Sequence, residues 1–421
     1  MGNYWISLAV CALTYLGLAY GRVPRLKIDR AGIALIGATI LIGTGVFSLD
    51  EAVRAVDFET IILLFGMMVV VSCLRLSGFF AAVGGSMLSR FSEPLPVLAL
   101  TIGLSGVLSA FLVNDVICLA MTPFVVLLTS RLRLNPVPYL IALATASNIG
   151  SSCTIIGNPQ NMIIGSLSKI PFLEFTSRLA PIAVIGLLLN FLLVAMIYRG
   201  KLRQDQTSFR TAIGIGIESS LTQLKALHRR VMLISLSITL GAVICFFSGL
   251  PIAIVALGAA SCLLVLLGKI RPEKIYREID WSLLVMFSGL FIVVHAFDLN
   301  ILSGWTPSAW GILGKNPIGF ITATSAVLSN LVSNVPAVLL FKAVLAATPE
   351  AVRQESWLAL ATASTFAGNF TLLGSVANLI VIESAKRRGI VVSFWEYFKV
   401  GLPLTLITLF LGFGWLSWVK L

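Results

Sequence analysis

Long apolar runs recur along the whole chain, and they constrain its fold more than any other feature. They occupy residues 4–20, 31–48, 58–77, 136–167, 172–198, 230–248, 251–268, 281–298, 356–385 and 395–418. Two further apolar stretches, 95–130 and 317–347, are interrupted near the middle by polar residues. About 20 apolar residues are what an α-helix needs to cross a bilayer. Because lipid offers no hydrogen bonds to backbone groups, each run is expected to be helical.

The composition agrees with an all-α integral membrane protein. The 421 residues are 58% hydrophobic and only 11% charged, and no stretch is polar enough to form a separate soluble domain. The first run, 4–20, is of full span length and lacks a small-residue cleavage site, so it is interpreted as a span and not a signal peptide.

Basic residues gather between the runs in a pattern that predicts the topology. With ten crossings and two hairpins that enter and leave on the same side, every cluster falls on one side of the membrane. The clusters are Arg22, Arg25, Lys27 and Arg30; Arg131 and Arg133; Lys201, Arg203, Arg210, Lys225, Arg229 and Arg230; Lys269, Arg271, Lys274 and Arg277; and Lys386, Arg387 and Arg388. By the positive-inside rule this side is cytoplasmic. We therefore predict a multi-pass protein of the cell membrane, inner or plasma, with both termini outside. Topology also explains the net charge of +12 without a nucleic-acid partner.

A duplication relates the two halves of the chain. The hexapeptide Ala-Leu-Ala-Thr-Ala-Ser occurs at 142–147 and again at 359–364. Polar positions beyond it also recur in order, and Asp57-Phe58 and Val107-Leu108-Ser109 return as Asp280-Trp281 and Val327-Leu328-Ser329. Five crossings per half give the halves opposite orientations. We predict two inverted repeats, 1–199 and 230–421, each with a re-entrant hairpin and a broken helix, joined by a cytoplasmic linker at 200–229.

Four segments place polar residues or unpaired backbone at membrane depth. They are 113–115, 148–161, 333–336 and 365–378. Such breaks persist only inside protein or beside a water-filled cavity. A broken helix offers N–H groups at the start of one fragment, which favour anions, and carbonyls at the end of the other, which favour cations. Duplicated breaks are a pointer to the binding site of a transporter.

The breaks supply the candidate site residues. The predicted substrate-binding residues are Asn114, Asp115, Asn161, Ser333, Asn334 and Asn378. The predicted cation or coupling residues are Asp115, Asn148, Gly150, Thr154, Gly157, Gly368, Asn369, Thr371 and Gly374.

Asp115 is the most informative of these residues, because a carboxylate near the membrane centre is costly and is by default a functional candidate. It could hold a cation or carry a proton. Lys342 could meet an anion or pair with an acid, although snorkelling outward is favoured. For His295, buried structural polarity is favoured over a proton relay. Cys118 and Cys153 lie near the breaks and are interpreted as small apolar filler.

At these residues the chain resembles the ion transporter superfamily, which includes divalent anion–sodium symporters, citrate–metal permeases, arsenite permeases and NhaD-type antiporters. The resemblance rests on Val113-Asn114-Asp115 with Thr122-Pro123, and on the segments 148–161 and 371–378. It implies a scaffold and a transport subdomain, a homodimer, substrate between the hairpin tips and elevator-type movement. The symporters carry Ser-Asn-Thr at each tip. Here the tips read Val113-Asn114-Asp115 and Ser333-Asn334-Val335, and this departure leaves dicarboxylate specificity and sodium dependence open.

The sequence therefore predicts a secondary active transporter of a small inorganic or organic anion in the lipid bilayer, coupled to H⁺ or Na⁺. An arsenite or antimonite efflux permease, a Na⁺/H⁺ antiporter and a passive channel remain alternatives. No cofactor or metal is expected beyond a coupling ion. An enzyme is not expected, since His228 and His295 are the only histidines and no His-Glu-x-x-His motif occurs.

Overall fold

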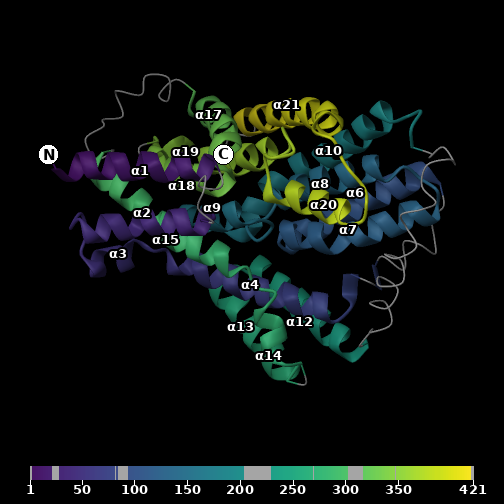
Figure 1. Ribbon diagram of the computed structural model, residues 1–421, viewed down its shortest axis with the longest axis horizontal. Coiled ribbons are helices and arrows are strands. Elements are labelled where there is room, and N and C mark those ends of the chain that lie inside the picture. Colours follow the sequence, from purple (N-terminus) through teal and green to yellow (C-terminus); the bar gives the residue numbers. More distant parts are fainter. Residues whose placement is uncertain are drawn as a thin grey trace.

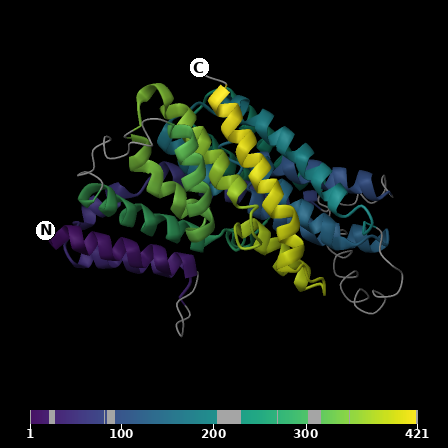
Figure 2. The same cartoon turned by 90° about the horizontal axis from the view of Figure 1, so that it is seen from above.

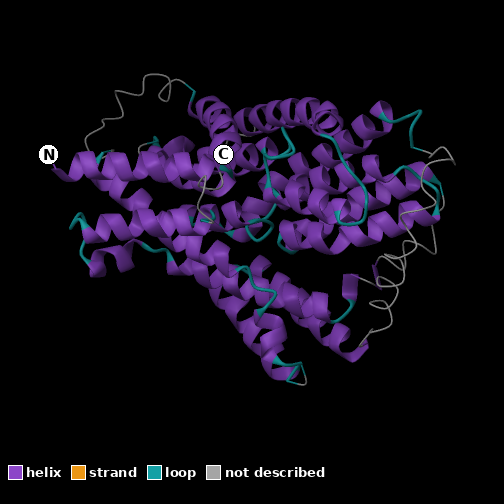
Figure 3. Cartoon of the chain, in the orientation of Figure 1, coloured by secondary structure: helices purple, strands orange, loops and turns teal. Residues whose placement is uncertain are grey.

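The chain folds as an assembly of membrane-length and shorter helices. The computed structural model describes residues 2–20, 28–80, 82–83, 93–202, 229–268, 270–301, 316–346 and 348–418. Within these residues all regular structure is helical (Figure 3). Eight of the described helices are long and apolar enough to cross a membrane. The predicted class, an all-α integral membrane protein, is confirmed.

The helices follow the same order in both halves of the chain. The first half contains α1 (Gly2–Tyr20), α2 (Arg30–Gly43), α3 (Leu49–Ala55), α4 (Phe58–Leu76), α6 (Pro94–Phe111), α7 (Asn114–Arg131), α8 (Pro136–Ser151), α9 (Pro159–Ser168) and α10 (Phe172–Ile197). The second half contains α12 (Arg229–Phe247), α13 (Ile252–Leu266), α14 (Pro272–Tyr276), α15 (Trp281–Asn300), α17 (Pro317–Val332), α18 (Asn334–Ala346), α19 (Glu350–Ala367), α20 (Val376–Lys386) and α21 (Phe394–Trp418). Each helix of the first half therefore has a counterpart of similar length in the second.

The helix breaks lie where the polar segments predict them. The hairpins break between α6 and α7 and between α17 and α18, and the broken helices part between α8 and α9 and between α19 and α20. The predicted span 31–48 was too long, because Thr44 closes α2 and Gly45, with a φ of 74°, turns the chain. The short helices α3 and α14 were not predicted.

Packing between the halves is reciprocal. Helix α2 lies against α15 and α4 against α13, while α7 packs on α20 and α18 on α9. Figures 1 and 2 show that the purple and blue helices of the first half lie on either side of the green and yellow helices of the second. A Cβ on Gly66 would lie 2.8 Å from the backbone of Ala256, and one on Gly289 would lie 2.7 Å from the backbone of Ala34. Each half thus contributes to the core of the other.

This reciprocity supports a duplication, while the repeat bounds, their opposite orientation and the side of the membrane stay predictions. Most of the predicted linker 200–229 lies outside the described residues. The same holds for seven members of the basic clusters, namely Arg22, Arg25, Lys27, Arg203, Arg210, Lys225 and Lys269.

Candidate substrate and ion site

All four helix breaks meet at one cavity of about 330 Å³. Part of its lining comes from the hairpin tips and the broken helices, with Asn114, Asp115, Pro159, Gln160, Ser333, Asn334, Val335, Ser375 and Val376. The rest of the lining comes from the beginnings of α2 and α15, with Asp29, Arg30, Ala31, Asp280, Ser282, Leu283 and Met286. A larger cavity, of about 1090 Å³, lies among α6, α10 and α21; it is mainly apolar and includes none of the predicted site residues.

Four of the helices that begin at the cavity come from the breaks. The first residues of α7, α9, α18 and α20 are Asn114, Pro159, Asn334 and Val376, and all four line it. The first turn of a helix carries unpaired N–H groups and the positive end of the helix dipole. Four converging N-termini therefore make the cavity favourable for an anion or for the oxygens of a polar solute.

The two hairpin-tip asparagines each present an unpartnered amide oxygen. The Nδ2 group of Asn114 donates to Oδ1 of Asn148 at 3.1 Å, while Asn114 Oδ1 is buried without a partner among the described residues. Asn334 Oδ1 is likewise buried without a partner among the described residues. Buried polar atoms in native proteins nearly always have partners. These two oxygens are therefore suited to a cation or to the hydroxyl groups of a ligand.

Asn148 connects the two halves behind the cavity wall. Its Oδ1 accepts from Asn114 Nδ2 and from Ser375 Oγ, each at 3.1 Å. Its Nδ2 donates to Asn369 Oδ1 at 2.9 Å and to Asn378 Oδ1 at 3.0 Å. The side chain is almost wholly buried. One amide from the first broken helix thus fixes a hairpin tip and the second broken helix in a single network.

Asn161 and Asn378 hold the two chain breaks in shape. Asn161 Nδ2 donates to three carbonyls in 151–154, at distances of 2.9 to 3.3 Å. Asn378 Nδ2 donates to the carbonyls of Gly368, at 2.7 Å, and Thr371, at 3.2 Å. Both residues are fully buried and neither lines the cavity. Their predicted contact with substrate stays a prediction, and the structure gives them a positioning role.

The predicted cation-site glycines allow close backbone packing at the breaks. A Cβ on Gly150 would lie 2.1 Å from the carbonyl oxygen of Gly106, so α8 and α6 touch through their backbones. The carbonyl of Gly157 accepts from the backbone N–H of Asn114 at 3.0 Å. A Cβ on Gly374 would lie 2.9 Å from the carbonyl oxygen of Gly368. These glycines bring carbonyl oxygens close to the hairpin tips.

Thr154 and Thr371 occupy corresponding places but differ in their contacts. The hydroxyl of Thr154 donates to the carbonyl of Ala110, near the tip of the first hairpin. Thr371 is partly exposed, and its carbonyl accepts from Asn378. Asn369 donates to the carbonyl of Thr145 at 3.3 Å. The predicted ion ligands are thus gathered around the breaks, with several of their groups already hydrogen-bonded.

Asp115 and Arg30 both line the cavity. Neither has a hydrogen-bond or ion-pair partner among the described residues. Asp115 lies in the first turn of α7, and its counterpart in the second hairpin is Val335. The cavity therefore holds a carboxylate and a guanidinium that are both available to a ligand.

The sequence interpretation missed several lining residues. Arg30 was assigned to a cytoplasmic cluster, and Asp280 was used only as a marker of the duplication. Gln160 and Ser375 lie in the quoted motifs, at the start of α9 and just before α20, which is the signal that could have identified them.

The other candidates lie away from the cavity. The His295 ring stacks on Phe47, with centroids 5.3 Å apart, and neither His295 nor Lys342 lines the cavity. The thiols of Cys118, which is buried, and Cys153, which is half-buried, are free, and neither residue lines the cavity.

Comparison with known proteins identifies relatives of the whole chain. A family model described as citrate transporter matches residues 21–367. The chain is 33% identical to the silicon efflux transporter LSI3 of Oryza sativa subsp. japonica, over 93% of each protein. It is 26% identical to the putative transporter arsB of Dictyostelium discoideum, over 92% of this chain and 87% of that protein. The solved YdaH transporter of Alcanivorax borkumensis shares the fold, with a TM-score of 0.59 at 14% identity over 99% and 96% of the two chains.

Proposed function

The chain belongs to the citrate transporter family of membrane transporters, and from that membership we propose that it is a secondary active transporter of a small anion. The observation that carries the proposal is the convergence of four helix N-termini on one cavity. Their N–H groups and dipoles stabilise negative charge. Arg30 adds a full positive charge to the cavity lining.

The size of the cavity supports a small solute. Drug-sized ligands occupy pockets of roughly 300 to 1,000 Å³, and this cavity lies at the lower end of that range. Asn114, Asn334, Gln160 and Ser375 offer amide and hydroxyl groups that hydrogen-bond to the oxygens of an oxyanion. A half-turn of the Asn334 amide would present Nδ2 in place of Oδ1.

Coupling to H⁺ or Na⁺ is assigned to Asp115 and the oxygens around it. A carboxylate without a partner gains stability by binding a proton or a cation. The unpartnered oxygens of Asn114 and Asn334, together with carbonyls such as that of Gly157, are the kind of hard ligand that Na⁺ takes. Asn148, Thr154, Asn369 and Thr371 position these groups.

The remaining parts of the proposal concern the whole molecule. We assign elevator-type movement to the hairpins and broken helices. We also propose that the protein assembles as a homodimer and that both termini lie outside the cell membrane. The lining of the cavity supports the elevator-type movement, because the hairpin tips and broken helices can move past α2 and α15. The charge clusters support the orientation.

A hydroxylated metalloid acid is the second candidate substrate. The relative from rice is named a silicon efflux transporter, and the Dictyostelium relative is named arsB. An uncharged acid of arsenic or silicon would hydrogen-bond to the same amides and hydroxyls without needing Arg30. A Na⁺/H⁺ antiporter is the third candidate, favoured only by the unpartnered Asp115.

Thermal unfolding of the purified protein separates these candidates. Dicarboxylates, sulfate, phosphate, arsenite and silicic acid are each added with and without Na⁺ and at two pH values. A ligand that binds the folded protein raises its apparent stability in proportion to its occupancy. A shift with an anion supports the first proposal, and a shift with arsenite or silicic acid alone supports the second. A shift with Na⁺ and no solute supports the antiporter.

A growth assay on arsenite checks the second candidate in cells. Expression should raise arsenite tolerance if the chain extrudes it, and the Asn114→Ala variant should lose that gain. Unchanged tolerance on expression would rule out arsenite efflux.

A further inference from the structure

Helices α4 and α15 are counterparts, and each begins with an aspartate cap. Asp57 Oδ1 accepts from the backbone N–H groups of Glu59, at 3.1 Å, and Thr60, at 3.4 Å. Asp280 Oδ1 accepts from the N–H of Leu283 at 3.0 Å. The two caps face different surroundings. Asp280 lines the cavity, whereas Asp57 is covered by the end of α9.

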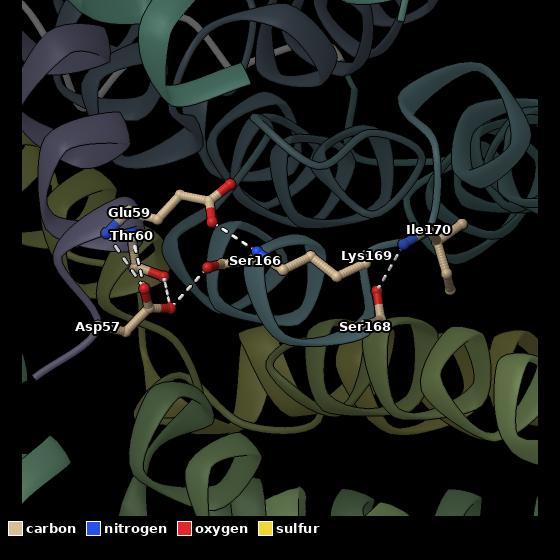
Figure 4. Close-up of polar contacts among 7 residues, drawn as sticks. All are labelled: Asp57, Glu59, Thr60, Ser166, Ser168, Lys169 and Ile170. Atoms are coloured by element: carbon tan, nitrogen blue, oxygen red, sulfur yellow. Dashed lines mark hydrogen bonds and ion pairs between the residues drawn. The ribbon is translucent and has the colours of Figure 1, made fainter. Parts of the chain in front are cut away.

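Two side-chain contacts join the end of α9 to the beginning of α4 (Figure 4). Ser166 Oγ donates to Asp57 Oδ2 at 2.6 Å, and the same oxygen accepts from Thr60 Oγ1 at 2.7 Å. Lys169 Nζ lies 2.5 Å from Glu59 Oε2. Lys169 closes α9 with a φ of 56°, in the left-handed region that most residues avoid. We call these four residues, Asp57, Glu59, Ser166 and Lys169, the α9–α4 contact.

The counterpart contact is not made. In the second half, Glu383 and Lys386 on α20 correspond to Ser166 and Lys169, and Asp280 corresponds to Asp57. Helix α4 packs against α9, but no comparable packing joins α15 to α20 within the described residues. Glu383 instead pairs with Arg387 at 3.6 Å. Side-chain contacts therefore join α9 to α4, whereas the counterpart helices α20 and α15 are not joined in the described part of the chain and Asp280 lines the cavity.

We propose that the α9–α4 contact is a closed gate, which holds the site accessible from the α2 and α15 side and must break before the site can open on the α4 side. This inference rests on the proposed transport function. The aspartate is a double acceptor, so a short charge-assisted bond from Ser166 is a specific link between two elements. The Lys169–Glu59 pair is exposed to solvent and contributes less.

Cross-linking tests whether the gate must open. Glu59→Cys and Lys169→Cys are combined, because neither residue caps α4, and a bifunctional thiosulfonate bridges them in proteoliposomes. Bridged protein should transport at least ten-fold more slowly while keeping its ligand-induced thermal shift, and reductant should restore transport. The controls are each single cysteine variant and the wild type with its own six cysteines, treated with the same reagent.

The possible outcomes distinguish a failure of the gate from a failure of the proposed transport function. Transport at the unbridged rate in fully bridged protein overturns the gate and leaves the proposed function intact. A wild type that neither transports nor binds any solute overturns the proposed function, and the gate falls with it.

A second variant tests the gate without a cross-link. Ser166→Ala removes the short bond and leaves the cap of α4 in place. A cysteine introduced at Val335 should then react about ten- to one-hundred-fold faster with an impermeant maleimide applied from the α4 side, the range expected for losing a hydrogen bond to a charged group. Ser168→Ala is the matched control, since Ser168 Oγ accepts only from the N–H of Ile170 at the same helix end. Equal labelling rates in both variants would overturn the gate.

Discussion

At the scale of single residues, charge inside the cavity decides how the site can work. Asp115 and Arg30 face the same space without partners, and both are costly to hold inside a membrane protein. Asp29 and Asp280 also line the cavity, but each caps a helix and has its charge used by backbone N–H groups. Asp115 and Arg30 therefore remain the charges that a ligand or coupling ion can meet.

Asp115→Asn should uncouple transport from its driving ion. The amide keeps the shape of the side chain but neither releases a proton nor attracts a cation with a full charge. Solute exchange should persist, while the dependence of uptake on the pH or Na⁺ gradient is lost. Flux in proteoliposomes under imposed gradients measures this. The control variant is Asp50→Asn, which removes an exposed carboxylate outside the cavity. An Asp115→Asn protein with wild-type pH and ion dependence would exclude the coupling role.

Arg30→Gln should weaken anion binding, because it removes the guanidinium from the cavity lining. We expect the anion concentration for half-maximal transport to rise about ten-fold, equivalent to about 1.4 kcal/mol. Arg30→Lys keeps the positive charge needed for topology and should retain part of the affinity. Arg271→Gln removes an exposed charge from a neighbouring cluster and serves as the control. Equal affinity in Arg30→Gln and wild type would remove Arg30 from the site.

At the scale of elements, the function depends on where helices stop. Each break brings a helix N-terminus to the cavity, and glycine contacts let the broken helices reach it. Gly150 against Gly106 is the tightest of these approaches, since α8 and α6 meet there through backbone atoms. The hairpin tip at Ser333 adds a residue with a φ of 77°, an uncommon value outside glycine that is often found at functional sites.

Gly150→Ala should destabilise the protein by forcing α8 away from α6. The added Cβ would lie 2.1 Å from the Gly106 carbonyl oxygen, and overpacking of this kind costs about 1 to 3 kcal/mol. The midpoint of thermal unfolding should fall, and the ligand-induced shift should shrink with it. Gly103→Ala on α6 is the matched control, because nothing lies within 4 Å of its added Cβ. If both variants unfold at the same temperature, the close approach is not important for stability.

The sequence predicted the breaks but not all of their surroundings. Asn, Gly and Pro inside apolar runs mark helix ends, so the stops after α6, α8, α17 and α19 could be located from residue types alone. The early end of α2 could not, because Thr44 and Gly45 resemble ordinary small residues of a membrane helix. The role of Arg30 was hidden because a basic residue next to a span looks the same whether it faces cytoplasm or a cavity.

At the scale of the whole molecule, the two halves interlock. Each hairpin packs on the broken helix of the other half, and Asn148 reaches three residues of the second half through one amide. These three partners lie more than 200 positions away along the chain, and no local pattern in a single sequence indicates such a pairing. The duplicated motifs predicted that the halves correspond, whereas the coordinates show how they join.

The central claim is that the hairpin tips of both halves form one binding site for a transported solute. Uptake into proteoliposomes with an imposed H⁺ or Na⁺ gradient tests it, with the wild type, Asn114→Ala and Asn334→Ala run beside one another. We predict saturable accumulation of a small oxyanion or metalloid acid against its gradient, lost in both variants while their thermal unfolding stays cooperative. Accumulation that survives either substitution unchanged, or flux that never saturates, would contradict the account.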